Sequence, residues 1–313
     1  MISVVIPAYN AERWLAGCLD SVMEQAIPEM EVIVVNDGST DSTPDIAARY
    51  PGVKTVTTPN RGLAAARNEG IEASTRKWIT FVDSDDRLLP GALRAMLDTA
   101  SSTKALIIGG EIVRTLSVAI PQEYKTDVME GREALLLMLY QTRYPFLGSM
   151  CGKIYDRSLF ERERFTSGLY YEDLELSSRL FHKPIHVAMI SRPVYFYYNN
   201  PSSFVNTFSG QRFDALRTAQ IIMKRCNTDP ELSRAALSRR LSANFNMLGL
   251  VLANGMPAEY AYVADACYKF IQTNRRKCFA DKRSRLKNKI GILLSYLPKP
   301  IFYMFMRREY RKK

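Results

Sequence analysis

The chain has 313 residues, 47% of them hydrophobic, which is enough for a large core and for a main domain with an appendage. Its five cysteines are odd in number, widely spaced and without a CxxC pair, which excludes a disulfide framework or a cysteine zinc site and favours a reducing compartment. The first residues lack the basic segment of a signal peptide. The sequence also has no run of about 18 uncharged apolar residues, so no membrane span is predicted. We therefore expect a cytoplasmic protein.

The net charge of +11 is concentrated in the last third of the chain. Residues 205–313 contain 22 Lys and Arg against 7 Asp and Glu, whereas residues 1–204 contain 21 against 25. A region with such an excess of positive charge is expected to meet an anionic partner, either a membrane surface or a nucleic acid.

Strand and helix patterns alternate through the first hundred residues. Near-continuous apolar runs predict strands at residues 2–8, 30–37, 53–58 and 77–83. Helical spacing predicts helices between and after them, at residues 11–25, 44–50, 62–74 and 90–100. Buried strands separated by helices predict an α/β fold with a parallel sheet that is covered on both faces.

The alternation loosens after residue 104. Further strands are predicted at residues 105–114, 151–156 and 194–198, and further helices at 131–142 and from Glu172 to residue 181. From about Phe208 the pattern is helical, with segments at 212–226, 231–253, 258–273 and 282–296. The predicted organisation is an α/β domain over residues 1–204 and a basic helical region over residues 205–313.

Polar residues follow each of the first four predicted strands. These residues are Pro7 to Asn10, Asn36 to Asp41, the group Arg61, Arg67 and Asn68, and Asp83 to Asp86. Ligands of open parallel sheets bind beyond the carboxyl ends of the strands. The turn preference of Asn, Asp and Gly explains any one of these stretches, but it explains four in succession poorly.

These four stretches and a fifth, around Glu172, together resemble glycosyltransferase family 2, which has the GT-A fold. They read VVIPAYN, VVNDGSTDST, NRGLAAARNEGI, FVDSDD and YYEDLE, in the family's order and spacing across residues 1–204. The resemblance implies a Rossmann-like, mixed and mostly parallel sheet flanked by helices, and transfer of a sugar from a nucleotide diphosphate sugar. The C-terminal third lies outside the motifs and is expected to form a helical appendage.

Three carboxylates lie within four residues at the end of the fourth strand, and we expect a divalent cation there. The chain lacks the glycine-rich phosphate loops GxxxxGK[ST] and GxGxxG, so carboxylates holding Mg²⁺ or Mn²⁺ are the alternative way to neutralise a diphosphate. Asp83 and Asp85 can place oxygens around one cation. The resemblance implies Asp85 as the metal ligand, Asp83 toward the ribose or the water shell of the metal, and Ser84 in the donor site. Asp86 is expected to cap the next turn.

The resemblance also implies the contacts of the nucleotide. Asp37 would contact the base or the ribose, and Arg67 the base or a phosphate. The base pocket would be lined by Pro7, Ala8 and Tyr9. Judged from the residues alone, the alternative for Arg67 is a solvated helix residue paired with Glu69 or Glu72.

The acidic pair Glu172 and Asp173 is the candidate catalytic centre. Acidic residues also favour the N-terminus of a helix because of its dipole, which is the structural alternative. The resemblance implies that Asp173 is the general base, a role that typically contributes about 10²–10⁴-fold to the rate. A single base with direct displacement implies inversion at the anomeric carbon.

Several other residues are candidates for a role in the predicted donor and acceptor site. The resemblance leads us to expect an Arg after the last strand, but Asn199 and Asn200 stand there, followed by Ser202 and Ser203. Lys153 is expected to face the acceptor. The remaining candidates, for which core packing is the alternative or the preferred reading, are Tyr195, Tyr197, Tyr198, His182 and His186.

The expected function is an inverting, metal-dependent hexosyl- or N-acetylhexosaminyltransferase in surface polysaccharide biosynthesis. UDP is the expected carrier, and the acceptor is a hydroxyl of a glycan or of a lipid-linked saccharide. The basic tail, with its apolar and aromatic residues, suits a helix at the inner face of the cell membrane, a solvated basic helical domain being the alternative. A sugar nucleotidyltransferase would need a GxGxR-like loop that is absent here. A nucleic-acid-binding protein would leave the acidic strand ends unexplained, so no nucleic acid partner is expected.

Overall fold

The computed structural model describes residues 1–144, 146–200, 203 and 207–311. The chain forms two compact units, which we call the α/β unit (residues 1–134 and 146–200) and the helical unit (residues 135–145 and 201–313). The predicted boundary after residue 204, like Ser202, lies outside the described residues. The sequence predicted one boundary between the two regions. In the structure, residues 135–145, which include the end of one helix, also belong to the helical unit.

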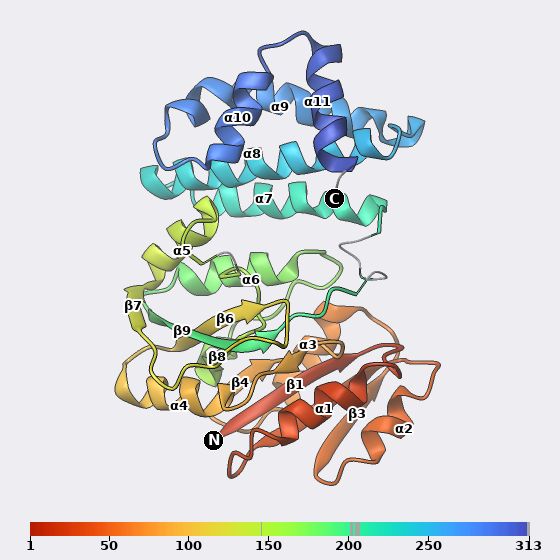
Figure 1. Cartoon of the computed structure of the whole chain (residues 1–313), viewed down its shortest axis with the longest axis vertical. Coiled ribbons are helices and arrows are strands. Elements are labelled where there is room, and N and C mark those ends of the chain that lie inside the picture. The colour runs from red at the N-terminus through yellow and green to blue at the C-terminus, as the bar shows by residue number, and fades with distance from the viewer. Residues whose placement is uncertain (145, 201–202, 204–206, 312–313) are drawn as a thin grey trace. The chain divides into compact units, whose positions relative to one another are not determined.

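The first half of the sheet is parallel, in the order β3-β2-β1-β4. Its strands are β1 (Ile2–Ala8), β2 (Glu31–Asp37), β3 (Val53–Thr58) and β4 (Trp78–Phe81). The connecting helices are α1 (Leu15–Met23), α2 (Thr43–Ala48) and α3 (Leu63–Ala73), as Figure 1 shows. The predicted alternation of strands and helices is therefore present, and each element lies within or close to its predicted range.

The second half of the sheet is mixed. Its strands are β5 (Arg87–Leu88), β6 (Ile107–Val113), β7 (Thr126–Glu130), β8 (Lys153–Asp156) and β9 (His186–Phe196). β8 runs antiparallel between β4 and β6, β9 is parallel to β6, and both β5 and β7 pair with β9 in the antiparallel sense. Its helices are α4 (Ala92–Ser102), α5 (Gly131–Tyr140) and α6 (Glu172–Phe181). The sequence did not predict β5 or β7, and β9 begins eight residues before its predicted start.

Successive side chains of β1 point to opposite faces of the sheet, and both faces are covered. Val4 and Ile6 belong to the core that is shared with α1, α2 and α4. Val5 faces α3, which lies so close that a Cβ atom on Gly70 would be 2.1 Å from Val5 Cγ1. Because both faces are packed, the open positions of these strands are at their carboxyl ends.

The helical unit contains α7 (Asp214–Arg225), α8 (Pro230–Ala253), α9 (Ala261–Ala280), α10 (Leu286–Leu294) and α11 (Lys299–Arg311). Four of these helices correspond to predicted segments, and α11 was not predicted as a separate helix. The core of the unit includes Phe245, Leu248, Cys267, Ile271 and Phe302. None of the helices in the described part of the chain is long and apolar enough to span a membrane.

All five cysteine thiols are free and buried. Burial raises the pKa of Cys226 to about 11 and the pKa of Cys267 and of Cys278 to about 12. Burial raises the pKa of Cys18 and of Cys151 well above the usual value, and nearby carboxylates raise it further. The thiols are therefore protonated and packed as small apolar groups at neutral pH.

Candidate functional site

The loops that follow β1 and β2 are hydrogen-bonded to each other. The amide of Asn10 donates to Ser39 Oγ at 3.0 Å, and the amide of Thr40 donates to Asn10 Oδ1 at 2.9 Å. Of the predicted base-pocket residues, Pro7 and Ala8 are buried in β1, whereas Tyr9 is 52% exposed. Tyr9 is thus the member of this group whose ring is open to a ligand.

Asp37, at the end of β2, holds the loop that leads into α3. Its Oδ1 accepts from the amide of Arg61 at 2.9 Å, and its Oδ2 accepts from the amide of Gly62 at 2.8 Å. The next residue is Gly38, with φ of 73°, and a Cβ atom there would lie 2.7 Å from the nitrogen of Asn60. Each carboxylate oxygen can accept more than one hydrogen bond, so Asp37 can organise this loop and still accept from a ligand.

A buried arginine joins two of the predicted site carboxylates. Arg67 NH2 lies 2.7 Å from Asp83 Oδ1, and Arg67 NH1 lies 2.7 Å from Glu172 Oε1. The Arg67 side chain is 4% exposed, so it is almost fully removed from water. The bridge brings together the end of β4 and the start of α6, which are about ninety positions apart in the sequence.

Arg67 does not pair with Glu69 or Glu72, the alternative partners on its own helix. Glu69 is paired with Arg61 at 2.6 Å, and Glu72 is paired with Arg164. Both pairs are more exposed than the pair of Arg67 with Glu172. Arg67 therefore points from α3 into the predicted site, whereas the acidic residues of the helix pair with arginines at the surface.

The other two carboxylates after β4 are held by the end of β9 and the residues after it. Asn200 Nδ2 donates to Asp85 Oδ2 at 3.1 Å. Asp86 is 1% exposed and accepts from the Tyr195 hydroxyl at 2.7 Å and from the amide of Tyr198 at 2.8 Å. Asp86 thus ties two strands together, and burial raises its pKa to about 8. It was expected to cap the next turn, and its observed partners come from β9 and the residue two places beyond it.

The arrangement of Asp83 and Asp85 fits a divalent cation that is shared with a ligand. Both side chains, and Ser84 between them, are partly exposed, whereas Asp86 is buried. In the described ranges, no group of three His, Cys, Asp or Glu side chains converges as in an all-protein metal site. Mg²⁺ is commonly held by one or two carboxylates together with substrate phosphates and water, and this donor set fits that description. Burial raises the pKa of Asp85, and a nearby cation would oppose that change.

The acidic pair lies in the first turn of α6. The residue before it, Tyr171, has φ of 63°, which is unusual for a residue with a side chain and common near functional sites. Asp173 Oδ1 accepts from the amide of Leu174 at 2.6 Å. Burial raises the pKa of Glu172 to about 7 and also raises the pKa of Asp173, while the charge of Arg67 opposes both changes.

Lys153 is fully buried at the start of β8. Its Nζ donates to the carbonyl oxygens of Phe146 at 3.0 Å and of Ser149 at 2.6 Å. Burial lowers the pKa of Lys153 to about 8, and the charge of Asp173 opposes this change. Lys153 was expected to face the acceptor, and the observed hydrogen bonds instead hold the segment before β8.

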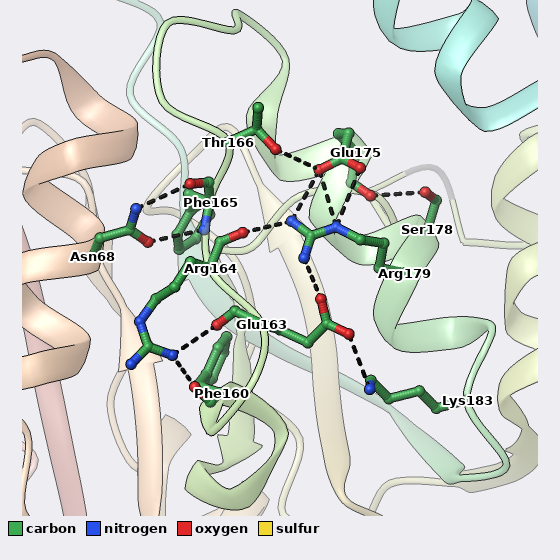
Figure 2. A network of polar contacts seen from close by, with 10 residues as sticks. All are labelled: Asn68, Phe160, Glu163, Arg164, Phe165, Thr166, Glu175, Ser178, Arg179 and Lys183. Carbon is green, nitrogen blue, oxygen red and sulfur yellow. Dashed lines mark hydrogen bonds and ion pairs between the residues drawn. The ribbon is translucent and has the colours of Figure 1, made fainter. Parts of the chain in front are cut away.

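A network of polar contacts anchors the helix that carries the acidic pair, as Figure 2 shows. Arg179 on α6 bonds to Glu175 on the same helix and pairs with Glu163 on the preceding segment. Lys183, just after α6, lies 2.9 Å from Glu163, and Arg179 also donates to the carbonyl oxygen of Arg164. These contacts fix α6 against residues 163–164, and so they fix the position of Glu172 and Asp173.

Asn68 fastens the same segment to α3. Its Nδ2 donates to the carbonyl oxygen of Phe165 at 2.9 Å, and its Oδ1 accepts from the amide of Phe165 at 2.8 Å. The ring of Phe165 lies 5.4 Å from the guanidinium carbon of the neighbouring Arg67. Asn68 therefore positions Phe165, whose ring packs against the guanidinium of the preceding residue, Arg67.

Sequence reasoning missed the roles of Asp86, Tyr195, Asn200 and Asn68, because each acts through a partner that is distant in the sequence. The one local signal was the aromatic run of the last strand, in which Tyr195 is buried, whereas Tyr197, just after the end of β9, is partly exposed. His182 and His186 are exposed, as expected for residues outside the site. Of the two serines that follow Asn199 and Asn200, Ser202 lies outside the described residues.

Comparison with protein-family models identifies the class of this fold and site. Residues 3–163 match the model described as "Glycosyl transferase family 2". The match spans more than half of the chain. The chain belongs to glycosyl transferase family 2.

Two curated relatives extend the comparison. EpsH of Bacillus subtilis (strain 168) is 31% identical over 229 residues, which are 68% of this chain and 65% of EpsH. The chondroitin synthase of Pasteurella multocida (strain Pm70) is 34% identical over 110 residues, which are 34% of this chain and 11% of the synthase. The matches therefore span less than two thirds of the length of these relatives.

Solved structures confirm the GT-A α/β fold that the sequence predicts. The crystal structure of S. aureus TarS 1–349 in complex with UDP-GlcNAc has a TM-score of 0.73 and 20% identity, and the match covers 99% of this chain and 91% of that one. The mannosyltransferase PcManGT from Pyrobaculum calidifontis, in complex with GDP-Man and Mn²⁺, has a TM-score of 0.55 and 17% identity, over 99% of this chain and 84% of that one. At these identities the likeness concerns the fold.

Proposed function

We propose that this protein transfers a sugar, with inversion, from a nucleotide diphosphate sugar to a hydroxyl of a glycan or of a lipid-linked saccharide. The observation that carries the proposal is the Arg67 bridge. It holds Asp83, which is predicted to lie in the donor site, and Glu172, the neighbour of Asp173, on the two terminal nitrogens of one guanidinium. A donor and a base must be this close for one displacement step.

The donor would bind at the carboxyl ends of β1, β2 and β4. Tyr9 and Asp37 would contact the base and the ribose, and Asp83, Ser84 and Asp85 would lie toward the diphosphate. Mg²⁺ or Mn²⁺, held by Asp85 and Asp83, would supply positive charge to the leaving diphosphate. The binding of UDP-GlcNAc by TarS and of GDP-Man with Mn²⁺ by PcManGT supports this part of the proposal, and we propose UDP as the carrier.

Asp173 is the proposed general base, and Glu172 is the proposed positioning residue. Glu172 is bound by Arg67, so its carboxylate is already engaged. Asp173 accepts the proton of the acceptor hydroxyl while the hydroxyl oxygen bonds to the anomeric carbon. The bond from that carbon to the diphosphate oxygen breaks in the same step, and the configuration inverts. Burial raises the pKa of Asp173, which makes its carboxylate a stronger base than an exposed one.

Substitution of Asp173 by Asn tests the base. We expect Asp173→Asn to lower the transfer rate by about 10²–10⁴-fold, because the amide cannot accept the proton. Calorimetry with UDP and Mn²⁺ should show unchanged donor binding. Asp98→Asn is the matched control, since Asp98 is exposed on α4 and its side chain is 62% exposed. Full transfer activity of Asp173→Asn would show that the base has been assigned wrongly.

Substitution of Asp85 by Ala tests the metal site. UDP should bind the unchanged protein more tightly with Mn²⁺ than after chelation, and Asp85→Ala should abolish this difference. If Asp85→Ala bound UDP with the same dependence on Mn²⁺, the metal role would fail. A panel of nucleotides and UDP-sugars in the same assay would identify the carrier and the sugar.

We also propose a role in the synthesis of a surface polysaccharide, at the inner face of the cell membrane. The relationship to a chondroitin synthase supports the product class. The positive charge of residues 205–313 supports the proposal that the protein acts at an anionic membrane surface.

A further inference from the structure

The exposed apolar side chains of the described residues gather in one part of the sequence. Eighteen large hydrophobic side chains are exposed, and half of them lie within residues 279–305. They are Phe279, Leu286, Ile290, Leu293, Tyr296, Leu297, Ile301, Met304 and Phe305. Scattered exposed apolar residues need no explanation, whereas a concentration of this kind indicates an interaction surface.

Helix α10 is apolar on its outer face. Leu286, Ile290 and Leu293 follow one another at spacings of four and three, so they share one face of the helix, and all three are exposed. Asn288 and Ile292 are buried on another side. The usual amphipathic pattern places polar residues outward, so the outer face of α10 is built for an apolar environment.

Helix α11 has the same character. Ile301, Met304 and Phe305 share an exposed face, while Phe302 and Met306 are buried. We call the exposed apolar residues of α10 and α11 the α10–α11 face; it consists of Leu286, Ile290, Leu293, Ile301, Met304 and Phe305. Both helices belong to the helical unit, so the face does not depend on the other unit.

A pocket of about 780 Å³ opens beside this face, between α8, α10 and α11. Ile290 and Phe305 of the face line it, together with the core residue Phe245. Three basic residues, Arg285, Lys287 and Arg308, lie in the same lining against one acidic residue, Glu309. The pocket therefore joins an apolar interior to positive charge, the combination that suits an acyl chain attached to a phosphate.

Part of the positive charge of this region has no acidic partner among the described residues. Residues 269–313 contain 15 Lys and Arg against 2 Asp and Glu. In the described part of the chain, Lys289, Arg307 and Arg308 have no acidic partner at ion-pair distance, although other basic residues of the unit do, such as Lys299 with Asp265. An anionic partner would supply the missing counter-charge.

We infer that the α10–α11 face docks on an anionic phospholipid bilayer, with the neighbouring pocket receiving part of an acyl chain. The apolar side chains enter the boundary between headgroups and acyl chains, and the basic residues meet the lipid phosphates. A second copy is a poorer occupant, because a two-fold interface would set the same basic residues against each other. The inference deepens the proposed position at a membrane and does not need the transfer reaction to be correct.

Vesicle sedimentation of the full chain tests the surface. We expect binding to vesicles that contain phosphatidylglycerol, and little binding to phosphatidylcholine alone. The double variant Leu293→Gln with Met304→Gln should partition at least about tenfold more weakly, because two exposed apolar side chains are replaced by amides of similar size. Tyr262→Gln is the matched control, since Tyr262 is 70% exposed on α9 of the same unit, and it should bind like the unchanged protein.

Fluorescence quenching tests the pocket. Ile290→Trp places an indole in the pocket lining, and phospholipids brominated on the acyl chain should quench it more than they quench Tyr262→Trp. The native Trp14 and Trp78 lie in the α/β unit and are subtracted with the unchanged protein. Equal quenching at the two positions would overturn the role of the pocket.

Three outcomes would overturn the inference. The first is an absence of binding to phosphatidylglycerol vesicles. The second is undiminished binding by the double variant, which would make the contact purely electrostatic. The third is a dimer, seen by analytical ultracentrifugation without lipid, that the double variant dissociates. UDP calorimetry on the same variants keeps this test separate from the proposed function, because loss of vesicle binding with intact UDP binding concerns the face alone.

Discussion

Charged residues gather in two regions of this molecule, the strand ends of the α/β unit and residues 269–313 of the helical unit, and the two regions differ in how far their charges are paired within the protein. At the strand ends, a buried arginine, Arg67, is paired with two carboxylates of the protein, Asp83 and Glu172. On α11, Arg307 and Arg308 are exposed without an acidic partner among the described residues. The partners of a charge cluster, more than its sign or density, indicate how much of its charge is neutralised within the protein and how much is available to an external ligand.

The largest expected effect is at Arg67. We expect Arg67→Met to lower the free energy of unfolding by about 3–5 kcal/mol, because the buried Glu172 and the partly exposed Asp83 would both lose their counter-charge. Urea unfolding measures the change. Arg61→Met is the control, since Arg61 pairs with Glu69 at the surface and should cost no more than about 1 kcal/mol. Equal losses in the two variants would remove the distinction between buried and exposed charge.

An intermediate effect is expected at Asp86, as a dependence of stability on pH. The pKa of this carboxyl is about 3.9 in an unfolded chain and about 8 in the folded protein. Between these values the folded state holds a proton that the unfolded state has released, so stability falls as the pH rises from 5 to 8. One such group changes the free energy by at most about 1.4 kcal/mol per pH unit. Asp86→Asn should flatten this slope in urea unfolding series, and an unchanged slope would contradict the assignment.

The smallest effect is expected in the helical unit. Lys299 and Asp265 form an ion pair at 2.8 Å, but their side chains are 45% and 67% exposed. Asp265→Asn should therefore change the free energy of unfolding by less than about 0.5 kcal/mol. A loss as large as that of Arg67→Met would mean that surface pairs hold this unit together, and the contrast between the two regions would fail.

The sequence predicted the parallel half of the sheet well, because its signals are local. Apolar runs such as residues 2–8 can be buried on both faces only within a covered parallel sheet, and the helices between them have clear spacing. The strand β7 was missed because its residues are mostly exposed and alternate weakly. Helix α11 was missed, because the last predicted segment ends at residue 296; its apolar residues lie on both its buried and its exposed sides.

The site was predicted as a set of residues but not as a set of contacts. Arg67 was expected either to contact the ligand or to pair with a neighbour in its own helix, and its partners are 16 and 105 residues away. The latch of Asp86 to Tyr195 spans 109 residues. Pairing over such distances is decided by tertiary packing, which one sequence does not display. The roles of Asp173, Asp85 and Asp37 in catalysis and binding stay predictions.

The reactivity of the five buried thiols can be used to follow the unfolding of the molecule. A thiol that is protonated and shielded from solvent reacts slowly with alkylating agents, and unfolding removes both protections. Native protein should therefore accept a label at an introduced surface cysteine, for example in Tyr262→Cys, while its own cysteines stay unmodified. The two units carry different cysteines, Cys18 and Cys151 in one and the other three in the helical unit, so the order in which these thiols become reactive would reveal which unit opens first.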